Sequence, residues 1–231
     1  MTRDDEIEVA PETAVAPGQL GKLELMKRIA AASKAGDNVG DAGIYKLELV
    51  GGMEPDDPRM KELLAPVAGY HPRVDLDALA DLAPGSLGRE YADHMRLYGL
   101  HPLNVSPQLL GIARAYPLGA RYLVTHDLFH TILGFDTSAA GEVGVYAFAA
   151  GQGYSRGLTR AYRTSVVAFA LYCPHRIGDL LRARRWGLAM GRAAAPLITC
   201  RFEERWEQPL ADLRAEYRIE PAPTRDGTPP A

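Results

Sequence analysis

The stretch of sequence that decides the fold is Tyr122-Leu-Val-Thr-His-Asp-Leu-Phe-His-Thr-Ile-Leu133. Drawn as a helix of about 100° per residue, it carries apolar side chains around nearly its whole circumference. A helix that is apolar on all sides is typical of a protein centre, where other elements cover every face. The stretch therefore predicts a buried helix over Leu118–Leu133, which Gly134 ends.

Three polar residues interrupt this apolar helix. On the helical wheel His130 lies about 40° and Asp127 about 100° from His126, so all three point into one sector. Burying two imidazoles and a carboxylate is unfavourable unless partners satisfy them. A divalent metal ion would do so, and so would a hydrogen-bonded network within the core.

A fourth candidate ligand follows after a short turn. The turn Gly134–Ser138 should fold Glu142 back beside the end of the first helix, because Thr137 or Ser138 can cap a helix from Ala139 to about Ala150. Imidazoles with carboxylates suit Zn(II), Fe(II) or Mn(II) better than Ca(II) or Mg(II), which prefer oxygen ligands. We therefore predict a divalent metal, Zn(II) first, with the ligands His126, Asp127, His130 and Glu142.

The rest of the chain is also predicted to be helical, since helical periodicity dominates and strand-like alternation is almost absent. We expect one all-α domain over residues 20–219, between a disordered leader at 1–19 and a disordered tail at 220–231. Its further helices are expected at Leu20–Lys34, Asp57–Ala65, Ser86–Tyr98, Ser155–Cys173, Arg176–Pro196 and Arg201–Tyr217. A shorter helix should begin where Ser106 caps Pro107 and end near Tyr116.

Composition excludes several classes of function. The formal charge of the 231 residues is −3, so there is no basic excess to neutralise phosphates, and nucleic acid is not an expected partner. Cys173 and Cys200 lack the CxxC spacing of a thiolate zinc site. Apolar runs such as Ser165–Cys173 are shorter than the ~20 residues of a membrane-spanning helix. The sequence therefore predicts a soluble or peripheral protein.

The motif HDLFHTILGFDTSAAGE, residues 126–142, resembles the signature of the coenzyme Q biosynthesis protein 4 family, which is His-Asp-x-x-His followed eleven residues later by Glu. Upstream, LAPGSLGREYADHM (Leu82–Met95) resembles the family's Pro-Gly-Ser/Thr-Leu-Gly-x-x-Tyr segment. Downstream, RWEQPLADLRAEYRI (Arg205–Ile219) resembles its Trp-x-x-Pro-Leu-x-x-x-Arg ending. The resemblance spans about Asp57 to Ile219.

This resemblance implies an enzyme of ubiquinone biosynthesis. Members of the family are described as helical domains with a hydrophobic cavity for a polyprenyl tail and a divalent metal, usually zinc, on the four motif residues. The implied reaction, of the lyase class, is the oxidative decarboxylation of a polyprenylated 4-hydroxybenzoate, in which a hydroxyl replaces the carboxylate on ring carbon 1. We expect Glu142 and Asp127 to act in catalysis as well, and other ubiquinone-biosynthesis proteins to be partners.

The location is inferred from the first eighteen residues. Mitochondrial members of the family carry presequences, whereas MTRDDEIEVAPETAVAPG is acidic and has no apolar core. We therefore expect a bacterial, cytoplasmic protein that is peripheral to the inner face of the cell membrane. We also expect a homo-oligomer.

Two other functions compete with this interpretation. In the first, the protein is a non-enzymatic scaffold that binds a prenyl lipid, and its metal is structural. In the second, it is a His-Asp metal phosphohydrolase, with His94, His101 and Asp179 joining the His126-Asp127 pair. The phosphohydrolase leaves His130 and Glu142 without roles.

One further helix is basic. Arg182, Arg184, Arg185 and Arg192 lie on an otherwise apolar helix. Such a helix can rest on anionic lipid headgroups or steer an acidic substrate, but a solvated structural face is the more common explanation.

Overall fold

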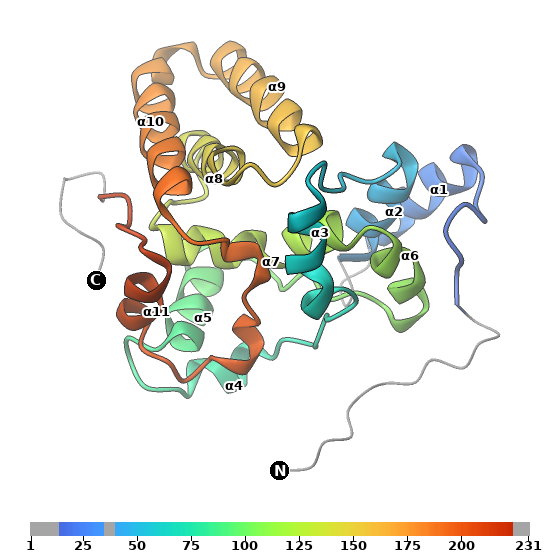
Figure 1. Ribbon diagram of the computed structural model, residues 1–231, viewed down its shortest axis with the longest axis horizontal. Coiled ribbons are helices and arrows are strands. Elements are labelled where there is room, and N and C mark those ends of the chain that lie inside the picture. The colour runs from blue at the N-terminus through green and yellow to red at the C-terminus, as the bar shows by residue number, and fades with distance from the viewer. Residues whose placement is uncertain (1–13, 35–39, 224–231) are drawn as a thin grey trace.

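The predicted central helix is the axis around which the protein is built. The computed structural model describes residues 14–34 and 40–223 (Figure 1). Helix α7 (Pro117–Leu133) is buried along most of its length and contacts α2, α5, α6 and α8. Pro117 stands at its first turn, and Gly134, with a φ of 74°, ends it in the left-handed region. The prediction of a buried helix is therefore confirmed.

The remaining elements of the described residues are also helical, and no strand occurs among them, which confirms the all-α prediction. The other α-helices are α1 (Lys22–Ala32), α2 (Gly40–Val50), α3 (Pro58–Leu64), α4 (Leu76–Ala80), α5 (Leu87–Tyr98), α6 (Leu110–Ala115), α8 (Ala139–Gln152), α9 (Arg156–Tyr172), α10 (Ile177–Ala193) and α11 (Leu210–Tyr217). Short 3-10 turns lie at Ala65–Val67, Pro107–Leu109, Pro174–Arg176, Leu197–Thr199 and Phe202–Glu204.

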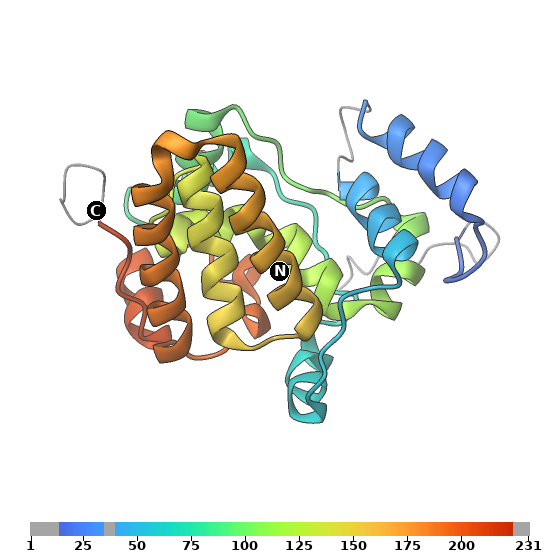
Figure 2. The same ribbon diagram turned by 90° about the horizontal axis from the view of Figure 1, so that it is seen from above.

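Helices α9, α8 and α10 lie side by side, with α8 in the middle (Figure 2). Two glycines of α10 bring its backbone against that of α8. A Cβ atom on Gly187 would lie 2.2 Å from the carbonyl oxygen of Gly144, and one on Gly191 would lie 2.3 Å from that of Phe148. Because real Cβ atoms do not approach a carbonyl so closely, this contact requires glycine at both positions of α10.

Helix α2 was not expected from the sequence. Its first turn is fixed by a distant residue, since the carboxylate of Asp41 accepts hydrogen bonds from the backbone N–H and the hydroxyl of Ser106, at 2.7 and 2.5 Å. Ser106 stands at the N-cap position before Pro107 as predicted, but its hydroxyl donates to Asp41 and makes no capping bond to the turn that follows. Helix α2 packs on α1 and α7 at the end of the molecule away from α10 (Figure 1).

The expected single helix over Arg201–Tyr217 is also wrong. A 3-10 turn comes first, and α11 begins only after Pro209. The backbone between them pairs with the start of α5, where the N–H groups of Leu87 and Gly88 donate to the carbonyl oxygens of Gln208 and Trp206. These long-range hydrogen bonds replace the bonds that a continuous helix would have made in this segment. Helix α4, which Asp75 caps, was also not predicted.

The two terminal segments fall largely outside the described residues. Of the expected leader, residues 14–19 are described, and the N–H of Val15 donates to the carbonyl oxygen of Gln108 at 2.9 Å. Residues 1–13 and 224–231, which hold the rest of the leader and most of the tail, are not described. The domain boundaries therefore stay predictions.

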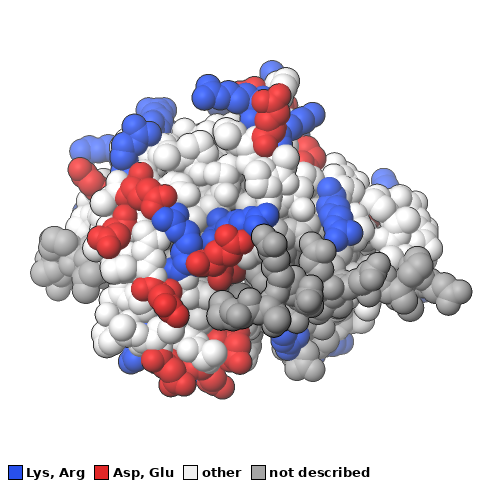
Figure 3. Space-filling view, turned by 60° about the horizontal axis from the view of Figure 1, so that its bottom comes forward, with Lys and Arg blue, Asp and Glu red and all other residues white. Residues whose placement is uncertain are grey.

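The surface agrees with the small net charge. On the face in Figure 3, acidic and basic side chains are interspersed, with wide uncharged areas between them. Among the described residues, no helix is both long enough and apolar enough to cross a membrane.

A buried ion pair ties the start of α7 to the C-terminal segment. Both terminal nitrogens of Arg121 donate to the carboxylate of Glu203, at 2.6 and 2.9 Å, and one also donates to the carbonyl oxygen of Cys200. The Arg121 side chain is fully buried and that of Glu203 nearly so. Such a pair must stay complete, since removal of one partner leaves a buried charge uncompensated.

We predict that Glu203→Ala lowers the free energy of unfolding by about 3–5 kcal/mol, because it strands the Arg121 guanidinium. Asp77→Ala serves as the control: it removes the partner of Arg96 in an ion pair whose Asp77 side chain is 95% exposed. That change should lose less than about 1 kcal/mol. Urea unfolding followed by circular dichroism measures both, and equal losses in the two variants would contradict the prediction.

Candidate metal centre

The turn between α7 and α8 brings the candidate ligands together. His126 and His130 stand one turn apart on α7, and Glu142 lies in the first turn of α8. The hydroxyl of Ser138 caps α8 by accepting from the N–H of Gly141 at 3.3 Å, as expected from the sequence. A Cβ on Gly141 would lie 1.7 Å from the carbonyl oxygen of Asp136, so only glycine lets the chain turn back this tightly.

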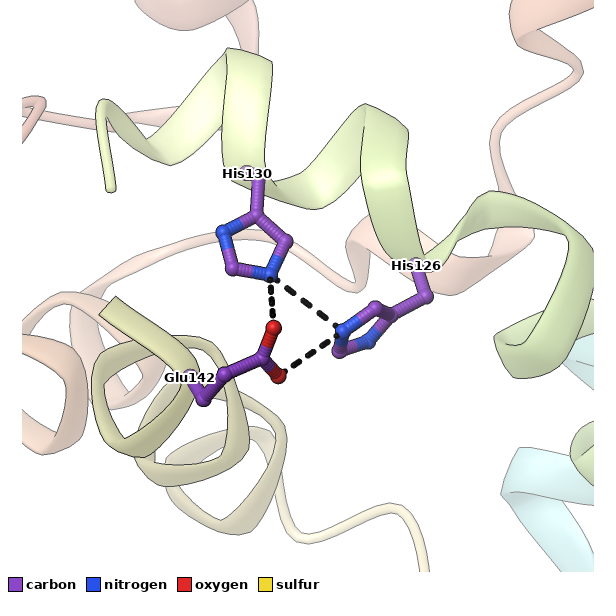
Figure 4. Close-up of side chains that lie close together, drawn as sticks. All are labelled: His126, His130 and Glu142. Carbon is purple, nitrogen blue, oxygen red and sulfur yellow. Dashed lines mark hydrogen bonds and ion pairs between the residues drawn. The ribbon is translucent and has the colours of Figure 1, made fainter. Parts of the chain in front are cut away.

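Three of the four predicted ligands form a triangle of donor atoms (Figure 4). The Nε2 atoms of His126 and His130 are 3.2 Å apart. The Nε2 of His126 lies 3.2 Å from Oε2 of Glu142, and the Nε2 of His130 lies 3.3 Å from Oε1. His130 is buried, whereas His126 and Glu142 are partly exposed.

Two arrangements can satisfy this triangle, a hydrogen-bonded network and a metal ion. The Nδ1 of His130 lies 3.2 Å from the carbonyl oxygen of Phe135, and a carbonyl only accepts, so Nδ1 carries the hydrogen. A neutral His130 then turns a bare Nε2 towards the Glu142 carboxylate, so that two acceptors face each other. A protonated His130 can donate from Nε2 to Oε1 of Glu142 while the Nε2–H of His126 donates to Oε2, so a hydrogen-bonded network can also satisfy the carboxylate. A cation among the three atoms satisfies all of them.

The separations also match the chemistry of zinc. Zinc bonds of about 2.0–2.1 Å at tetrahedral angles place neighbouring donor atoms about 3.3 Å apart. The two imidazole nitrogens, 3.2 Å apart, agree with this spacing, and each lies 3.2 or 3.3 Å from a different oxygen of the Glu142 carboxylate. The Phe135 carbonyl supplies the outer contact that fixes the orientation of a metal-binding imidazole. The three residues therefore fit a divalent metal, and with only three protein ligands one position stays open for water or substrate.

The electrostatics of the site favour a positive charge. Burial disfavours the carboxylate form of Glu142, but the hydrogen bonds and charges of His126 and His130 outweigh it and lower the pKa to about 2. Burial likewise opposes protonation of His130, yet the hydrogen bond and charge of Glu142, with the charge of Asp127, raise its pKa above the ordinary value. An anionic carboxylate thus stands ready beside the two imidazoles.

Asp127 lies outside the triangle. Burial raises the pKa of its carboxyl group, while the charges of His126 and His130 act in the opposite direction. Burial raises the pKa of the Tyr91 hydroxyl, and the nearby charge of Asp127 raises it further. The structure therefore brings Asp127 near the imidazoles without adding it to the group of close donor atoms, and its role as ligand stays a prediction.

Two tyrosines complete the surroundings. The rings of Tyr122 and Tyr146 lie 5.6 and 5.8 Å from that of His126. The Tyr122 hydroxyl is buried and has no hydrogen-bond partner within the described part of the chain. Sequence reasoning did not assign them to the site, although each stands four residues from a predicted ligand, which places it one helical turn away on the same face.

The residues of the phosphohydrolase alternative do not gather here. Asp179 pairs with Arg176 and Arg182, and His101 is exposed in the loop after α5. The ring of His94 lies 6.0 Å from that of His130 and is not among the close donor atoms. The arrangement does not support the phosphohydrolase.

The expected hydrophobic cavity is not confirmed. A groove of about 800 Å³ lies beside His130, between α5, α10 and the start of α8. Charged and polar side chains line much of it, among them Glu90, Asp93, His94, Arg176, Asp179 and Arg182. A cavity for a polyprenyl tail stays a prediction.

Comparison with known proteins gives a consistent result. The sequence profile described as "Coenzyme Q (ubiquinone) biosynthesis protein Coq4" matches residues 70–223. A ubiquinone biosynthesis protein COQ4 homolog of Rattus norvegicus is 34% identical over 203 residues, which cover 78% of this chain and 68% of the relative. Its counterpart in Aedes aegypti is 33% identical over 149 residues, which cover 64% of this chain. The chain spans about half of that relative's length, 53%.

A solved structure shares the fold. A crystal structure from Nostoc punctiforme, provisionally described as a ubiquinone biosynthesis protein, superposes with a TM-score of 0.56 and covers 85% of this chain and 87% of its own. At 22% identity, this likeness concerns the fold alone.

The expected cytoplasmic location in a bacterium is contradicted. The relatives from the rat, the mouse and the mosquito are all named mitochondrial proteins. The expectation had rested on the character of the first eighteen residues, most of which lie outside the described part of the chain.

We predict that the purified protein holds about one divalent transition metal per chain, and that His130→Ala and Glu142→Gln each lose it. The matched control is His175→Ala, which removes an exposed histidine after α9. Asp127→Asn should keep the metal with an affinity about 10–100-fold lower, as expected for a residue that acts through the ligands. Elemental analysis and competition with a chelator measure these effects. Full occupancy in both ligand variants would refute the site.

Proposed function

Since the chain belongs to the coenzyme Q (ubiquinone) biosynthesis protein Coq4 family, we propose that it is a metal-dependent enzyme of ubiquinone biosynthesis. Its proposed reaction is the oxidative decarboxylation of a polyprenylated 4-hydroxybenzoate, in which a hydroxyl replaces the carboxylate on ring carbon 1. The observation that carries an enzymatic role is the three-ligand triangle, because a structural site is usually closed by four protein ligands.

The proposed metal ligands are His126, His130 and Glu142, with Asp127 beside them. A bound Zn(II) would supply a Lewis acid for the substrate's carboxylate or phenolate but no redox chemistry, whereas Fe(II) or Mn(II) could also carry electrons. The Phe135 carbonyl keeps the His130 ring in the orientation that a ligand requires. The substrate supplies two electrons when its carboxylate leaves as carbon dioxide. When one atom of dioxygen enters the product hydroxyl, an external two-electron reductant must supply the two further electrons that reduce the other atom to water.

Other groups of the site prepare the substrate. Once the para hydroxyl of a 4-hydroxybenzoate is deprotonated, ring carbon 1 becomes electron-rich, so it can bond to oxygen and lose carbon dioxide as aromaticity returns. The partly buried Asp127 can accept the phenol proton, and the unpartnered Tyr122 hydroxyl can donate a hydrogen bond to a substrate oxygen. The apolar walls of α7 exclude water, which strengthens these interactions.

The polyprenyl tail bears on where the protein works. Each CH₂ removed from water contributes about 0.8 kcal/mol, so a long tail keeps the substrate in lipid. We therefore include in the proposal a tail-binding cavity, peripheral work at a membrane surface and contact with other ubiquinone-biosynthesis proteins. The alternative is a scaffold that presents a prenyl lipid and holds a structural metal, and the open position of the triangle speaks against it.

We predict that the metal-loaded protein converts prenylated 4-hydroxybenzoate to the carbon 1 hydroxyl product, with oxygen from labelled dioxygen in that hydroxyl. Glu142→Ala should lower turnover at least about 100-fold, because it removes a ligand, whereas Glu207→Ala, which changes an exposed acid, should not. Mass spectrometry of the product measures both. Turnover without label would remove dioxygen from the reaction, and unimpaired Glu142→Ala would remove this residue from it.

A further inference from the structure

Helices α9 and α10 form a hairpin whose tip, where the chain turns between them, lies at the top of Figure 1. Apolar side chains at this tip are exposed. Leu171 and Tyr172 at the end of α9 are 79% and 84% exposed. We define the hairpin tip as these two residues with their exposed apolar neighbours Val167, Ile177 and Leu181. Isolated exposed apolar residues are common, but a contiguous group of this kind marks an interaction surface.

The hairpin is also the most basic part of the chain. Between residues 156 and 193 it holds eight arginines and a single acidic residue, Asp179, a formal charge of +7 in a protein whose total is −3. Asp179 is already engaged by Arg176 and Arg182. The arginines farther from the tip, including Arg184 and Arg185, are exposed.

The order of apolar and basic residues along the hairpin matches a bilayer interface. Arg163 precedes Leu171 by eight residues and Arg185 follows Ile177 by eight. At about 1.5 Å per residue, both arginines lie about 12 Å back from the tip. An interfacial helix buries its apolar residues about 5–10 Å into the boundary between headgroups and acyl chains. Insertion of the tip to that depth brings the arginines to the level of the phosphates.

A second copy of the chain fits this surface poorly. A symmetric dimer through the tip would bring two hairpins together, each with a net formal charge of +7 along its length, so the exposed arginines of the two copies would repel. An anionic bilayer offers the opposite charge, together with an apolar interior. The exposed apolar side chains and the positive charge of the hairpin therefore both fit an anionic membrane.

We propose that the hairpin tip docks on an anionic membrane surface, with Leu171, Tyr172 and Ile177 inserted and the arginines of α9 and α10 on the headgroups. The inference deepens the proposed work at a membrane surface and rests on it. It names the part of the molecule that makes the contact.

The test is flotation of the purified full chain with vesicles of phosphatidylcholine and phosphatidylglycerol in a 7:3 ratio, without any prenylated aromatic. The wild type should bind these vesicles, bind pure phosphatidylcholine far less, and dissociate in 0.5 M salt, where charges are screened over a few ångströms (~4 Å). Leu171→Glu should lower binding at least about tenfold. The double variant Arg184→Gln, Arg185→Gln should lower vesicle binding about 25-fold, because each arginine near the membrane surface contributes about fivefold.

The matched control is Leu23→Glu on α1, since Leu23 is 68% exposed. It should bind as the wild type does, and thermal unfolding should be the same for every variant. If Leu171→Glu binds normally, or Leu23→Glu binds equally weakly, the tip is not the docking surface. If light scattering shows that Leu171→Glu dissociates an oligomer, the tip is a subunit interface and the inference is wrong. If the wild type binds no vesicles, the proposed membrane association fails as well, while the metal and turnover measurements still judge the reaction.

Discussion

The contact of two imidazoles with one carboxylate, His126 and His130 with Glu142, is the interaction on which the rest of the structure depends. Two imidazoles from one helix and a carboxylate from the next must meet within about one bond length of a common point. That requires α7 to lie inside the protein, so that neighbours hold its polar face in place. It also requires the chain to reverse at once after α7, which Gly134 and Gly141 permit. The Phe135 carbonyl, at the same turn, fixes the His130 ring.

The helices around this centre fix the position of α7, which carries the two histidines, relative to α8, which carries Glu142. Helix α8, which carries Glu142, lies between α9 and α10, while the Arg121–Glu203 ion pair fastens the start of α7 to the segment before α11. The two halves of the site are thus anchored independently, by close backbone packing on one side and by a buried charge pair on the other. The groove beside His130 is lined by both charged and apolar side chains.

Sequence reasoning found what local periodicity determines. The spacing of His126 and His130, the burial of α7, the capping of α8 by Ser138 and the return of Glu142 all follow from helix geometry and turn chemistry within about twenty residues. The elements that were missed depend on distant partners. Helix α2 has two glycines, Gly40 and Gly43, in its first four residues, which are weak helix formers, and its Asp41 is held by the distant Ser106. The first backbone N–H groups of α5 donate hydrogen bonds to the carbonyl oxygens of Trp206 and Gln208, far away in the sequence. Asp127 shows the limit within the motif, since a shared sector of a helical wheel does not place three donor atoms at one point.

The glycine contact between α8 and α10 bears on which substitutions the protein can tolerate. Side-chain packing usually absorbs a small change by choosing another rotamer, but here Gly187 and Gly191 press on carbonyl oxygens of α8, and a backbone has no rotamers. Even a single added methyl group at either glycine must displace the helix that bears Glu142. Positions more than forty residues from the ligand in sequence are therefore as intolerant of variation as the ligand itself, and damage there would present as a loss of function without any change to the residues of the centre.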